Sequence, residues 1–419
     1  MLQGPHGPFF AQLAAALEAT GASVHRVGFN AGDQFFWRRS DRYISFQMPL
    51  DTWPEELGFL LSEHAITDIV LYGDTRPVHA TAIAQARARG ICVHVFEEGY
   101  LRPYWITYER GGSNGHSQLC DMSVAQMRAR LPAGGIGVQA PDHWGALRHH
   151  VFYGALYHFC ILVGNKAYRR VSGHRAISVS AEFRLYLLKL LKLPFHAIRR
   201  RRAQRRITGG GYSYHLVLLQ LAHDANLLAH SPFADMQDFV ETVIRGFARG
   251  APGHHHLVFK AHPLDDGRIN LRKMVSESAK SHGIADRVHF LGGGKLGKLL
   301  DPATSCVTVN STAAQQALWR GLPLRAFGNS VYSKPEFVSN QPLTSFFAHP
   351  AGPDQLAYQD YRNFLLATSQ LPGNYYAGSG RRQVLRRVVD AILAPHDPYE
   401  MPKPDQTDAA RAQHIGIVN

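Results

Sequence analysis

Residues 256–263 read HLVFKAHP, a short apolar run that ends in polar residues and a proline. A run of this length, closed by a turn residue, is typical of a buried β-strand. Comparable runs recur in the second half of the chain, at 213–222 (SYHLVLLQLA), 287–293 (RVHFLGG) and 306–312 (CVTVNST). Stretches with helical spacing, at 234–250 and 268–283, lie between them. Strands that alternate with helices predict a parallel, doubly wound α/β sheet.

The first half of the chain shows the same alternation. Helices are expected at 9–20, 53–64 and 79–89, and strands at 24–30, 41–46, 66–74 and 92–99. The strand that usually opens such a unit is missing or reduced to the first few residues. Two α/β units joined by an irregular middle predict two Rossmann-like domains that face each other.

These patterns also predict the domain boundaries. We expect an N-terminal Rossmann-like domain over 1–144, a basic helical insertion over 145–211, a C-terminal Rossmann-like domain over 212–380, a crossing helix over 381–395 and a flexible tail over 396–419. The tail is rich in Pro, Asp and Gln and poor in residues that build a core.

The composition is that of a globular protein and excludes several classes. The chain has 419 residues, of which 45% are hydrophobic and 18% are charged, so it is neither disordered nor a coiled coil. Four cysteines without a CxxC pair argue against a disulfide scaffold and a zinc ribbon. The chain has no GxxxxGK[ST] loop, which argues against a P-loop NTPase. It also has no DxD triplet, which argues against a nucleotide-sugar site bridged by a metal ion. We therefore predict no metal and no cofactor.

The positive charge is concentrated in one segment. The net charge is +13, and residues 166–206 alone hold ten Arg and three Lys against one acid, Glu182. The leucines of 183–193 stand among these cations, which predicts a helix at a lipid surface; a solvated connector is the alternative. Nucleic acid is disfavoured, because a duplex has no use for the leucines. The arginines expected at an anionic membrane surface are Arg199, Arg200, Arg201, Arg202, Arg205 and Arg206.

No secretory signal opens the sequence, and the apolar run 151–163 is too short for an ordinary membrane span. We therefore expect a cytoplasmic protein that touches a membrane.

Four polar clusters follow predicted strands, where ligands bind in open parallel sheets. After one strand, Glu97 and Glu98 offer a buried acid for proton exchange, or a strand-end cap. In the strand 256–263, Lys260 and His262 share a face that suits a phosphate, although a buried structural histidine fits equally.

The other two clusters are also in the second half. Asn310, Ser311 and Thr312 open a predicted helix, where they form an anion site, an N-cap or both. Gln220 and Asp224 follow the strand 213–222, and their spacing alone favours a turn cap for Asp224.

In order, Glu98-Gly99, His262-Pro263 and Ser311-Thr312 resemble the D/E-G, H-P and S-S/T motifs of GT-B glycosyltransferases that use CMP-activated acidic sugars. The flanking sequence is similar to capsule polysaccharide proteins of the KpsS/LipB type over about residues 2–395. Stretches that carry this resemblance are LQGPHGPFF, FNAGDQFFW, DIVLYGDTRPVH, VFEEGYLRPYWIT, NGHS and LVFKAHPLD.

The resemblance implies a GT-B fold and a retaining, metal-independent β-Kdo transferase. It would move Kdo from CMP-β-Kdo to a phosphatidylglycerol-type lipid at the inner face of the inner membrane, with a KpsC-like transferase and a capsule ABC exporter as partners. A non-catalytic export accessory that binds lipid-linked polysaccharide is the alternative, and a sialyltransferase is a second rival that the capsule-type flanking sequence disfavours.

The resemblance also implies site roles. Asp224 would be the nucleophile, Glu98 the base that deprotonates the acceptor, and His262 the catalytic partner of the departing phosphate. Donor contacts would come from Lys260, Asn310, Ser311, Thr312, Gln220 and Glu336. Acceptor or sugar contacts would come from Gly4, His6 and Gly7, in a loop that faces the same cleft, and from Arg102, Asn114 and His116, for which ordinary loop structure is the alternative.

Overall fold

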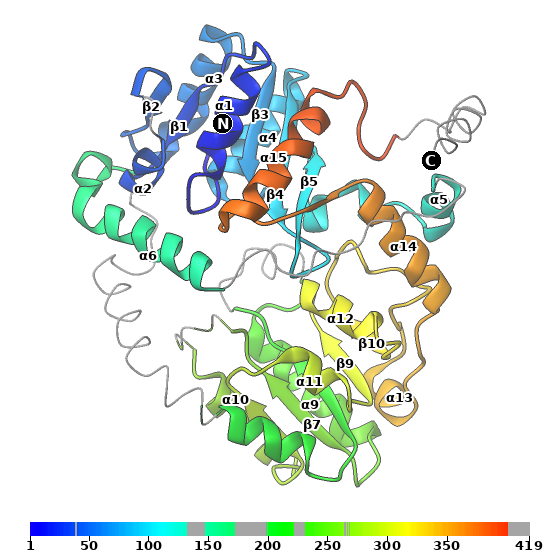
Figure 1. The fold of residues 1–419 in the computed structure, drawn as a ribbon. Helices are drawn as coiled ribbons and strands as arrows, with labels where there is room; N and C mark the ends of the chain where they lie inside the picture. Colours follow the sequence, from blue (N-terminus) through cyan, green and yellow to red (C-terminus); the bar gives the residue numbers. More distant parts are fainter. Residues whose placement is uncertain are drawn as a thin grey trace.

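The structure is a computed structural model that describes residues 1–37, 40–131, 147–171, 198, 200–221, 231–263, 265, 267 and 269–400. It consists of two α/β lobes, drawn one above the other in Figure 1. The predicted pair of Rossmann-like domains is confirmed, and the arrangement is of the GT-B type.

The N-terminal lobe is built on a mixed sheet of order β11-β5-β4-β3. Its strands are β3 (Asp68–Tyr72), β4 (Cys92–Glu98), β5 (Trp105–Arg110) and β11 (Gln370–Pro372). β3 and β4 are parallel, whereas β5 and β11 run antiparallel to their neighbours. The expectation of a wholly parallel sheet is therefore wrong for this lobe. The chain turns back directly after β4, and this hairpin leaves no helix between β4 and β5.

Residues 1–3 take the place of the missing opening strand. The amide of Leu2 donates to the carbonyl of Val70 in β3 (2.8 Å), and the amide of Val27 donates to the carbonyl of Met1 (3.0 Å). The segment thus links β3 to a separate parallel pair, β1 (Arg26–Gly28) and β2 (Tyr43–Ser45). The prediction that this strand is reduced to a few residues is confirmed.

Helices cover both faces of the N-terminal sheet. Phe96 of β4 packs in one core with Phe9 of α1 (Phe9–Glu18) and Val384 of α15 (Gly378–Leu393). Val95 belongs to the opposite core, with Leu57 of α3 (Trp53–Glu63) and side chains of α4 (Pro77–Ala88). Successive strand residues point to opposite faces, so β4 is buried on both sides. Three further helices of the first half are α2 (Ala31–Phe35), α5 (Val124–Ala129) and α6 (Leu147–Gly164).

The C-terminal lobe holds a wholly parallel sheet of order β10-β9-β6-β7-β8. Its strands are β6 (Tyr214–Leu218), β7 (His256–Lys260), β8 (Val288–Leu291), β9 (Ser305–Thr308) and β10 (Leu324–Ala326). Its helices are α9 (Met236–Gly250), α10 (Leu271–Ser281), α11 (Leu296–Leu300), α12 (Gln315–Leu318) and α13 (Leu343–Ala348). The strand order reverses between β6 and β9, and such a switch point is where doubly wound sheets bind ligands.

The chain then returns to the N-terminal lobe earlier than residue 381. After α14 (Gln355–Ala367), β11 joins the N-terminal sheet beside β5, and α15 packs on α1. The expected crossing helix exists, but it begins at Gly378, and the crossing itself begins before β11.

The expected flexible tail is partly packed. Tyr399 is buried, and its hydroxyl donates to the carboxyl group of Glu109. The expectation of a free tail from residue 396 is therefore wrong up to residue 400, because this tyrosine finds an apolar pocket and a buried acceptor. Residues 401–419 lie outside the described part of the chain.

The basic insertion contributes two described helical pieces, α6 and residues 200–208. The leucine-rich stretch 183–193 lies outside the described residues. Within the described ranges, none of the helices combines the length and the apolar character that a bilayer span requires.

Candidate functional site

A pocket of about 100 Å³ lies between the two lobes, at the carboxyl ends of their strands. Both lobes contribute to its lining: Glu97, Glu98, Arg102, Asn114 and Gly115 come from the first, and Gln220, His262, Asn310, Ser311, Thr312, Ala313, Asn329, Ser330 and Val331 from the second. The three motifs that stand far apart in the sequence, at Glu98, His262 and Ser311, therefore meet in one place.

Glu98 is the last residue of β4 and is held by two tyrosines. Its Oε1 accepts hydrogen bonds from the hydroxyls of Tyr72 and Tyr376, both at 3.2 Å. Glycine is required directly after it, because a Cβ atom at Gly99 would lie 2.1 Å from the carbonyl oxygen of Trp105. The Glu-Gly pair thus combines an acid fixed in direction with a close turn between β4 and β5.

Glu97 is a second carboxyl group in the same pocket. Its Oε1 accepts from the amide of Glu98 (2.9 Å) and its Oε2 from the side chain of Asn114 (3.4 Å). Burial raises the pKa of Glu97 to about 7, and the neighbouring Glu98 adds to the effect. A carboxyl group with this pKa exchanges protons readily near neutral pH. The sequence identified the pair but gave the role to Glu98 alone.

Hydrogen bonds to buried side chains hold the loop that carries Asn114. Asn114 has a positive φ of 51°, a conformation that asparagine tolerates better than most residues. Its amide donates to the hydroxyl of Tyr100 (2.6 Å), which in turn donates to the buried Glu109 (3.1 Å). His116 of the same loop pairs with the buried Asp74 (3.1 Å) and does not line the pocket.

On the C-terminal side, Gln220 and Asn310 join the ends of β6 and β9. The side-chain amide of Gln220 donates to Oδ1 of Asn310 (2.8 Å), and the backbone amide of Asn310 donates to Oε1 of Gln220 (3.1 Å). Both side chains are buried. This pair links the two chain segments that leave the sheet at its switch point, and it fixes the turn that follows Asn310.

That turn is shorter than expected. Ser311 caps a three-residue 3-10 turn (Thr312–Ala314), and the helix α12 that follows has four residues, so no long helix points its N-terminus into the pocket. Ser311 Oγ accepts from the amide of Ala313 (3.3 Å), which confirms the capping role that the sequence left open. The same turn lines the pocket beside His262.

Hydrogen bonds between the lobes hold the two sides of the pocket in position relative to each other. Lys334 donates to the carbonyls of Leu119 and Cys120, the latter at 2.8 Å. Asn329 donates to the carbonyl of Gly115 (3.2 Å), directly at the pocket.

Several predicted site residues lie elsewhere. Lys260 is buried and does not line the pocket, and burial lowers its pKa to about 8. Glu336 is exposed. Gly4, His6 and Gly7 pack against Phe10, Tyr157 and Tyr153, respectively. Asp224 and Arg199 lie outside the described residues.

Three of the predicted arginines line a separate basic groove of about 530 Å³. Its lining includes Arg200, Arg201, Arg205, Gln204, Thr208, Pro263, Gly293, Gly294, Lys295 and Lys298. No acidic side chain is among these described residues. Pro263 lies next to His262, so the groove and the pocket share one turn. Arg202 and Arg206 are exposed and lie outside this lining.

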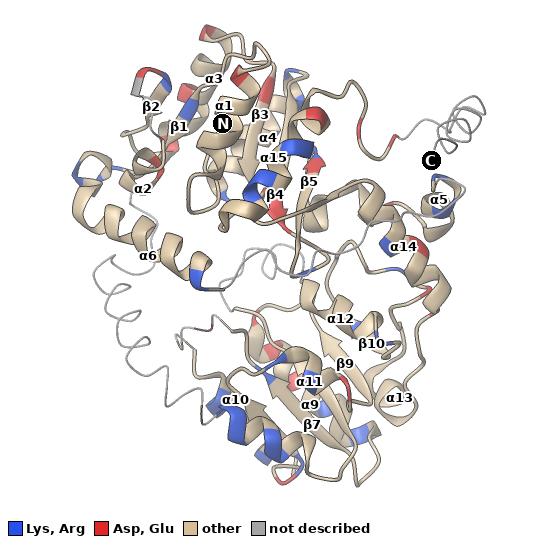
Figure 2. Ribbon diagram, in the orientation of Figure 1, with Lys and Arg blue, Asp and Glu red and all other residues tan. Residues whose placement is uncertain are grey.

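The groove is built on a glycine-rich loop after β8. Residues 292–298 read GGGKLGK, which has the glycine and lysine spacing of a phosphate-binding loop, with Leu299 where a metal-binding hydroxyl would stand. Gly293 and Gly294 have φ of 136° and 122°, and a Cβ at Gly293 would lie 2.9 Å from the side chain of Arg200. Figure 2 shows Lys and Arg gathered in this lobe, around α10.

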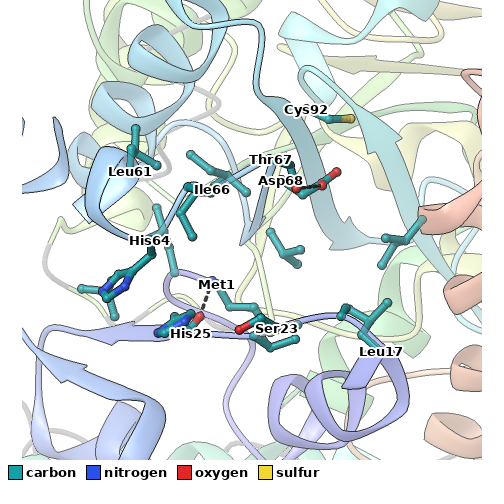
Figure 3. A pocket seen from close by; sticks show the side chains of 18 of the residues that line it. Met1, Leu17, Ser23, His25, Leu61, His64, Ile66, Thr67, Asp68 and Cys92 are labelled. Carbon is teal, nitrogen blue, oxygen red and sulfur yellow. Dashed lines mark hydrogen bonds between the residues drawn. The ribbon is translucent and has the colours of Figure 1, made fainter. Parts of the chain in front are cut away.

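A further cavity of about 540 Å³ lies at the opposite end of the N-terminal sheet (Figure 3). Asp68 and Cys92, the first residues of β3 and β4, line it and lie close to His94. His94 Nε2 and Asp68 Oδ1 are 2.9 Å apart, and this partner lowers the pKa of Asp68. These side chains are of metal-ligating types, but they lie at the strand ends far from Glu97 and Glu98.

The sequence analysis missed three residues that hold or border the site. Tyr72 lies near the end of the predicted strand 66–74 and is the last residue of β3, so its position near the site was recoverable in principle. Tyr376 and Asn329 follow no predicted strand and reach the site only through the return of the chain and the packing of the lobes.

Comparisons with known proteins agree on one family. A family model described as "Capsule polysaccharide biosynthesis protein" matches residues 67–376. The chain is 30% identical to the capsule polysaccharide export protein KpsS of Escherichia coli, over 90% of this chain and 96% of that protein. It is also 30% identical to the capsule polysaccharide modification protein LipB of Neisseria meningitidis serogroup B, over 90% of this chain and 91% of that protein.

Among solved structures, the β-Kdo 2,7 transferase of Thermosulfurimonas dismutans KpsC is similar with a TM-score of 0.43 and 11% identity, over 93% of this chain and 97% of that one.

Proposed function

The chain belongs to the capsule polysaccharide biosynthesis family, and on that premise we propose that it is a retaining β-Kdo transferase. It would move Kdo from CMP-β-Kdo to a (lyso)phosphatidylglycerol-type lipid and so start the linker of a capsule polysaccharide. One observation carries the proposal: Glu97 and Glu98 of one lobe share a pocket with His262 and Ser311 of the other.

The C-terminal side of the pocket suits the leaving group. When the bond between Kdo and CMP breaks, negative charge grows on the phosphate of CMP. His262 and the hydroxyls of Ser311 and Thr312 line the pocket as donors to that phosphate. The proposal assigns the stabilisation of this charge to protein side chains and not to a metal ion. Arg102, at the rim of the same pocket, is a partner for the carboxylate of an acidic sugar.

Retention follows from two displacements. The carboxylate of Asp224 attacks the anomeric carbon, and CMP leaves with the electron pair of the broken bond. The acceptor oxygen then displaces Asp224, while Glu98 takes the hydroxyl proton and later returns it to water. The tyrosines that hold Glu98 orient this base. Glu97, with its pKa of about 7, is the alternative base.

The basic groove suits the phosphate of the lipid acceptor. It adjoins the pocket at His262-Pro263 and offers five cations from two chain segments. An anionic headgroup held there would present its hydroxyl towards the pocket. The protein would then work at the inner face of the inner membrane, as a peripheral protein. A KpsC-like transferase and the capsule exporter would act on its product.

A transfer assay tests the function. The full chain is incubated with CMP-Kdo and lysophosphatidylglycerol, and the lipid is expected to gain the mass of one Kdo. Glu98→Gln and Asp224→Asn should each lose transfer, whereas Glu55→Gln, an exposed carboxyl on α3, should retain it. Full activity of either site variant overturns the corresponding role. Binding of lipid-linked polysaccharide without any transfer by the unaltered chain would favour the export accessory.

The intermediate gives a second readout. If Asp224 is the nucleophile, Glu98→Gln incubated with CMP-Kdo should show a protein mass increase of one Kdo, because the second displacement is slowed. The same increase should be absent when Asp224→Asn is added to this variant.

A further inference from the structure

Helix α6 has two contrasting faces, and one of them is firmly docked. The hydroxyl of Tyr157 donates to Asp33 (3.1 Å) and accepts from the side chain of Asn30 (2.8 Å). The ring of His6 stacks on Tyr157 at 4.2 Å, and Ile161 is 1% exposed. This face of α6 is therefore held against α2 and the N-terminal loop.

The opposite face of α6 is apolar and exposed. α6 contributes five of the large apolar side chains that are exposed among the described residues: Val151, Phe152, Phe159, Leu162 and Val163, with exposed fractions of 45%, 60%, 50%, 38% and 60%. Positions 152, 159 and 163 are seven and four residues apart, so they fall on one helical stripe. An apolar stripe of this size on a surface helix marks an interaction site.

The charged side chains within α6 and just beyond its end are all positive. Residues 147–171 contain no Asp or Glu, and exposed cations stand at both ends of the helix. These are Arg148 at the start and Lys166, Arg169 and Arg170 beyond the end. An exposed apolar stripe between cations is the pattern of a helix that lies in the plane of an anionic lipid surface.

The first turn of α6 lies close to a residue that holds Glu98 of the candidate pocket. The ring of His150 lies 4.3 Å from the ring of Tyr376, whose hydroxyl donates to Glu98. A lipid surface in contact with α6 would therefore lie near the carboxylate proposed to activate the acceptor.

We propose that α6 is an interfacial membrane helix, with Val151, Phe152, Phe159, Leu162 and Val163 inserted among the headgroups of an anionic bilayer. The inference rests on the proposed function only in the identity of the acceptor as a lipid. A helix in this position delivers the protein to its acceptor and sets the distance between the bilayer and Glu98.

Vesicle co-sedimentation of the full chain tests the proposal. The probes are phosphatidylcholine vesicles with and without phosphatidylglycerol. The unaltered chain should prefer the phosphatidylglycerol vesicles, and Phe152→Ser with Phe159→Ser should weaken this binding by about tenfold or more. The control is Phe59→Ser with Leu356→Ser, which removes two exposed apolar side chains on α3 and α14, with exposed fractions of 59% and 77%.

A labelling experiment gives a readout that does not depend on loss of binding. Cysteine is placed at Phe159 or at Leu356 and is labelled with an environment-sensitive dye, with the labelled unaltered chain as background. Fluorescence should rise on addition of phosphatidylglycerol vesicles for the first label and stay constant for the second. Equal responses from both labels would overturn the assignment.

Other outcomes separate the proposals. Unchanged vesicle binding by the α6 double variant, or equal losses in both double variants, overturns the membrane helix. Dimers that dissociate in the α6 variant while vesicle binding persists would show that a second copy covers this face, which also overturns it. Release of CMP from CMP-Kdo without lipid reports on the catalytic pocket. Vesicle binding through α6 in a chain that never transfers Kdo would leave this inference standing and remove the proposed function.

Discussion

The carboxylate of Glu98 accepts a hydrogen bond from the hydroxyl of Tyr376, which lies 278 residues further along the chain. Tyr376 lies two residues before the start of α15, the helix that covers one face of the N-terminal sheet. A group proposed to move a proton is thus oriented by a residue from the other end of the sequence.

Replacement of Tyr376 by phenylalanine should slow Kdo transfer by about tenfold, because a hydrogen bond to a charged group contributes on the order of 1.5 kcal/mol. The affinity for CMP should be unchanged, because the nucleotide is expected on the opposite side of the pocket. Transfer kinetics and CMP titration measure the two effects. The control is Tyr43→Phe, which removes a hydroxyl that is hydrogen-bonded to the hydroxyl of Tyr168 (3.0 Å), far from the pocket. It should change neither the rate of transfer nor the affinity for CMP. Equal slowing in both variants would show a general loss of stability.

The raised pKa of Glu97 predicts a pH-dependent stability. The folded chain holds a proton on Glu97 up to about pH 7, whereas the ordinary value is 4.5. The free energy of unfolding should therefore fall as pH rises through this range. Glu97→Gln should be more stable than the unaltered chain at about pH 8, by on the order of 1 kcal/mol.

The difference between Glu97→Gln and the unaltered chain should shrink towards about pH 5, where Glu97 is protonated in the folded chain. Urea titrations between about pH 5 and about pH 8 measure this difference in the free energy of unfolding, with Glu55→Gln as the exposed control. A difference that stays constant or grows as pH falls would contradict the burial of this carboxyl group.

Gly99→Ala should destabilise the chain by about 2 kcal/mol or more, because the added Cβ would lie 2.1 Å from the carbonyl oxygen of Trp105. The turn after Glu98 would have to open, so transfer should fall as well. Gly253→Ala is the control, since its Cβ would meet nothing within 4 Å. Thermal denaturation of both variants measures the difference in stability. Equal midpoints would contradict the close approach of Gly99 to Trp105.

The basic groove predicts that position on the helix matters more than total charge. Arg201→Glu with Arg205→Glu should weaken the binding of monomeric dihexanoyl phosphatidylglycerol by about tenfold or more. Arg202→Glu with Arg206→Glu carries the same change of charge outside the groove lining and should have a much smaller effect. Lys295→Glu with Lys298→Glu, in the facing loop and in α11, should repeat the first result. Calorimetry with the lipid and with CMP measures both. A loss of CMP affinity in place of lipid affinity would assign the groove to the donor.

The strand ends of the C-terminal sheet were predictable because each strand is a continuous apolar run. Parallel strands that are buried on both faces show this pattern, and it located Gln220, His262 and Asn310 at one edge. The same logic located Glu98. The same logic did not give the position of Lys260. Alternation along a strand predicts the face on which a side chain lies, but not whether the side chain lines the pocket or is buried beside it.

Antiparallel partners from distant segments were not predictable. β5 and β11 pair at a separation of more than two hundred residues, and no local sequence pattern in either segment identifies the other as its partner. Tyr399 likewise reaches Glu109 from a segment whose composition indicates disorder. In each case, tertiary burial decided the structure of a segment whose own sequence was ambiguous.

The N-terminal lobe is completed by segments that follow the C-terminal lobe in the chain. β11, α15 and Tyr399 supply an edge strand, a covering helix and a partner for a buried acid, so the first half of the nascent chain exposes an incomplete core until residues 370–399 have been synthesised. Translation that stops before residue 370 would therefore release an aggregation-prone fragment, and residues 1–131 alone are not a unit for separate expression.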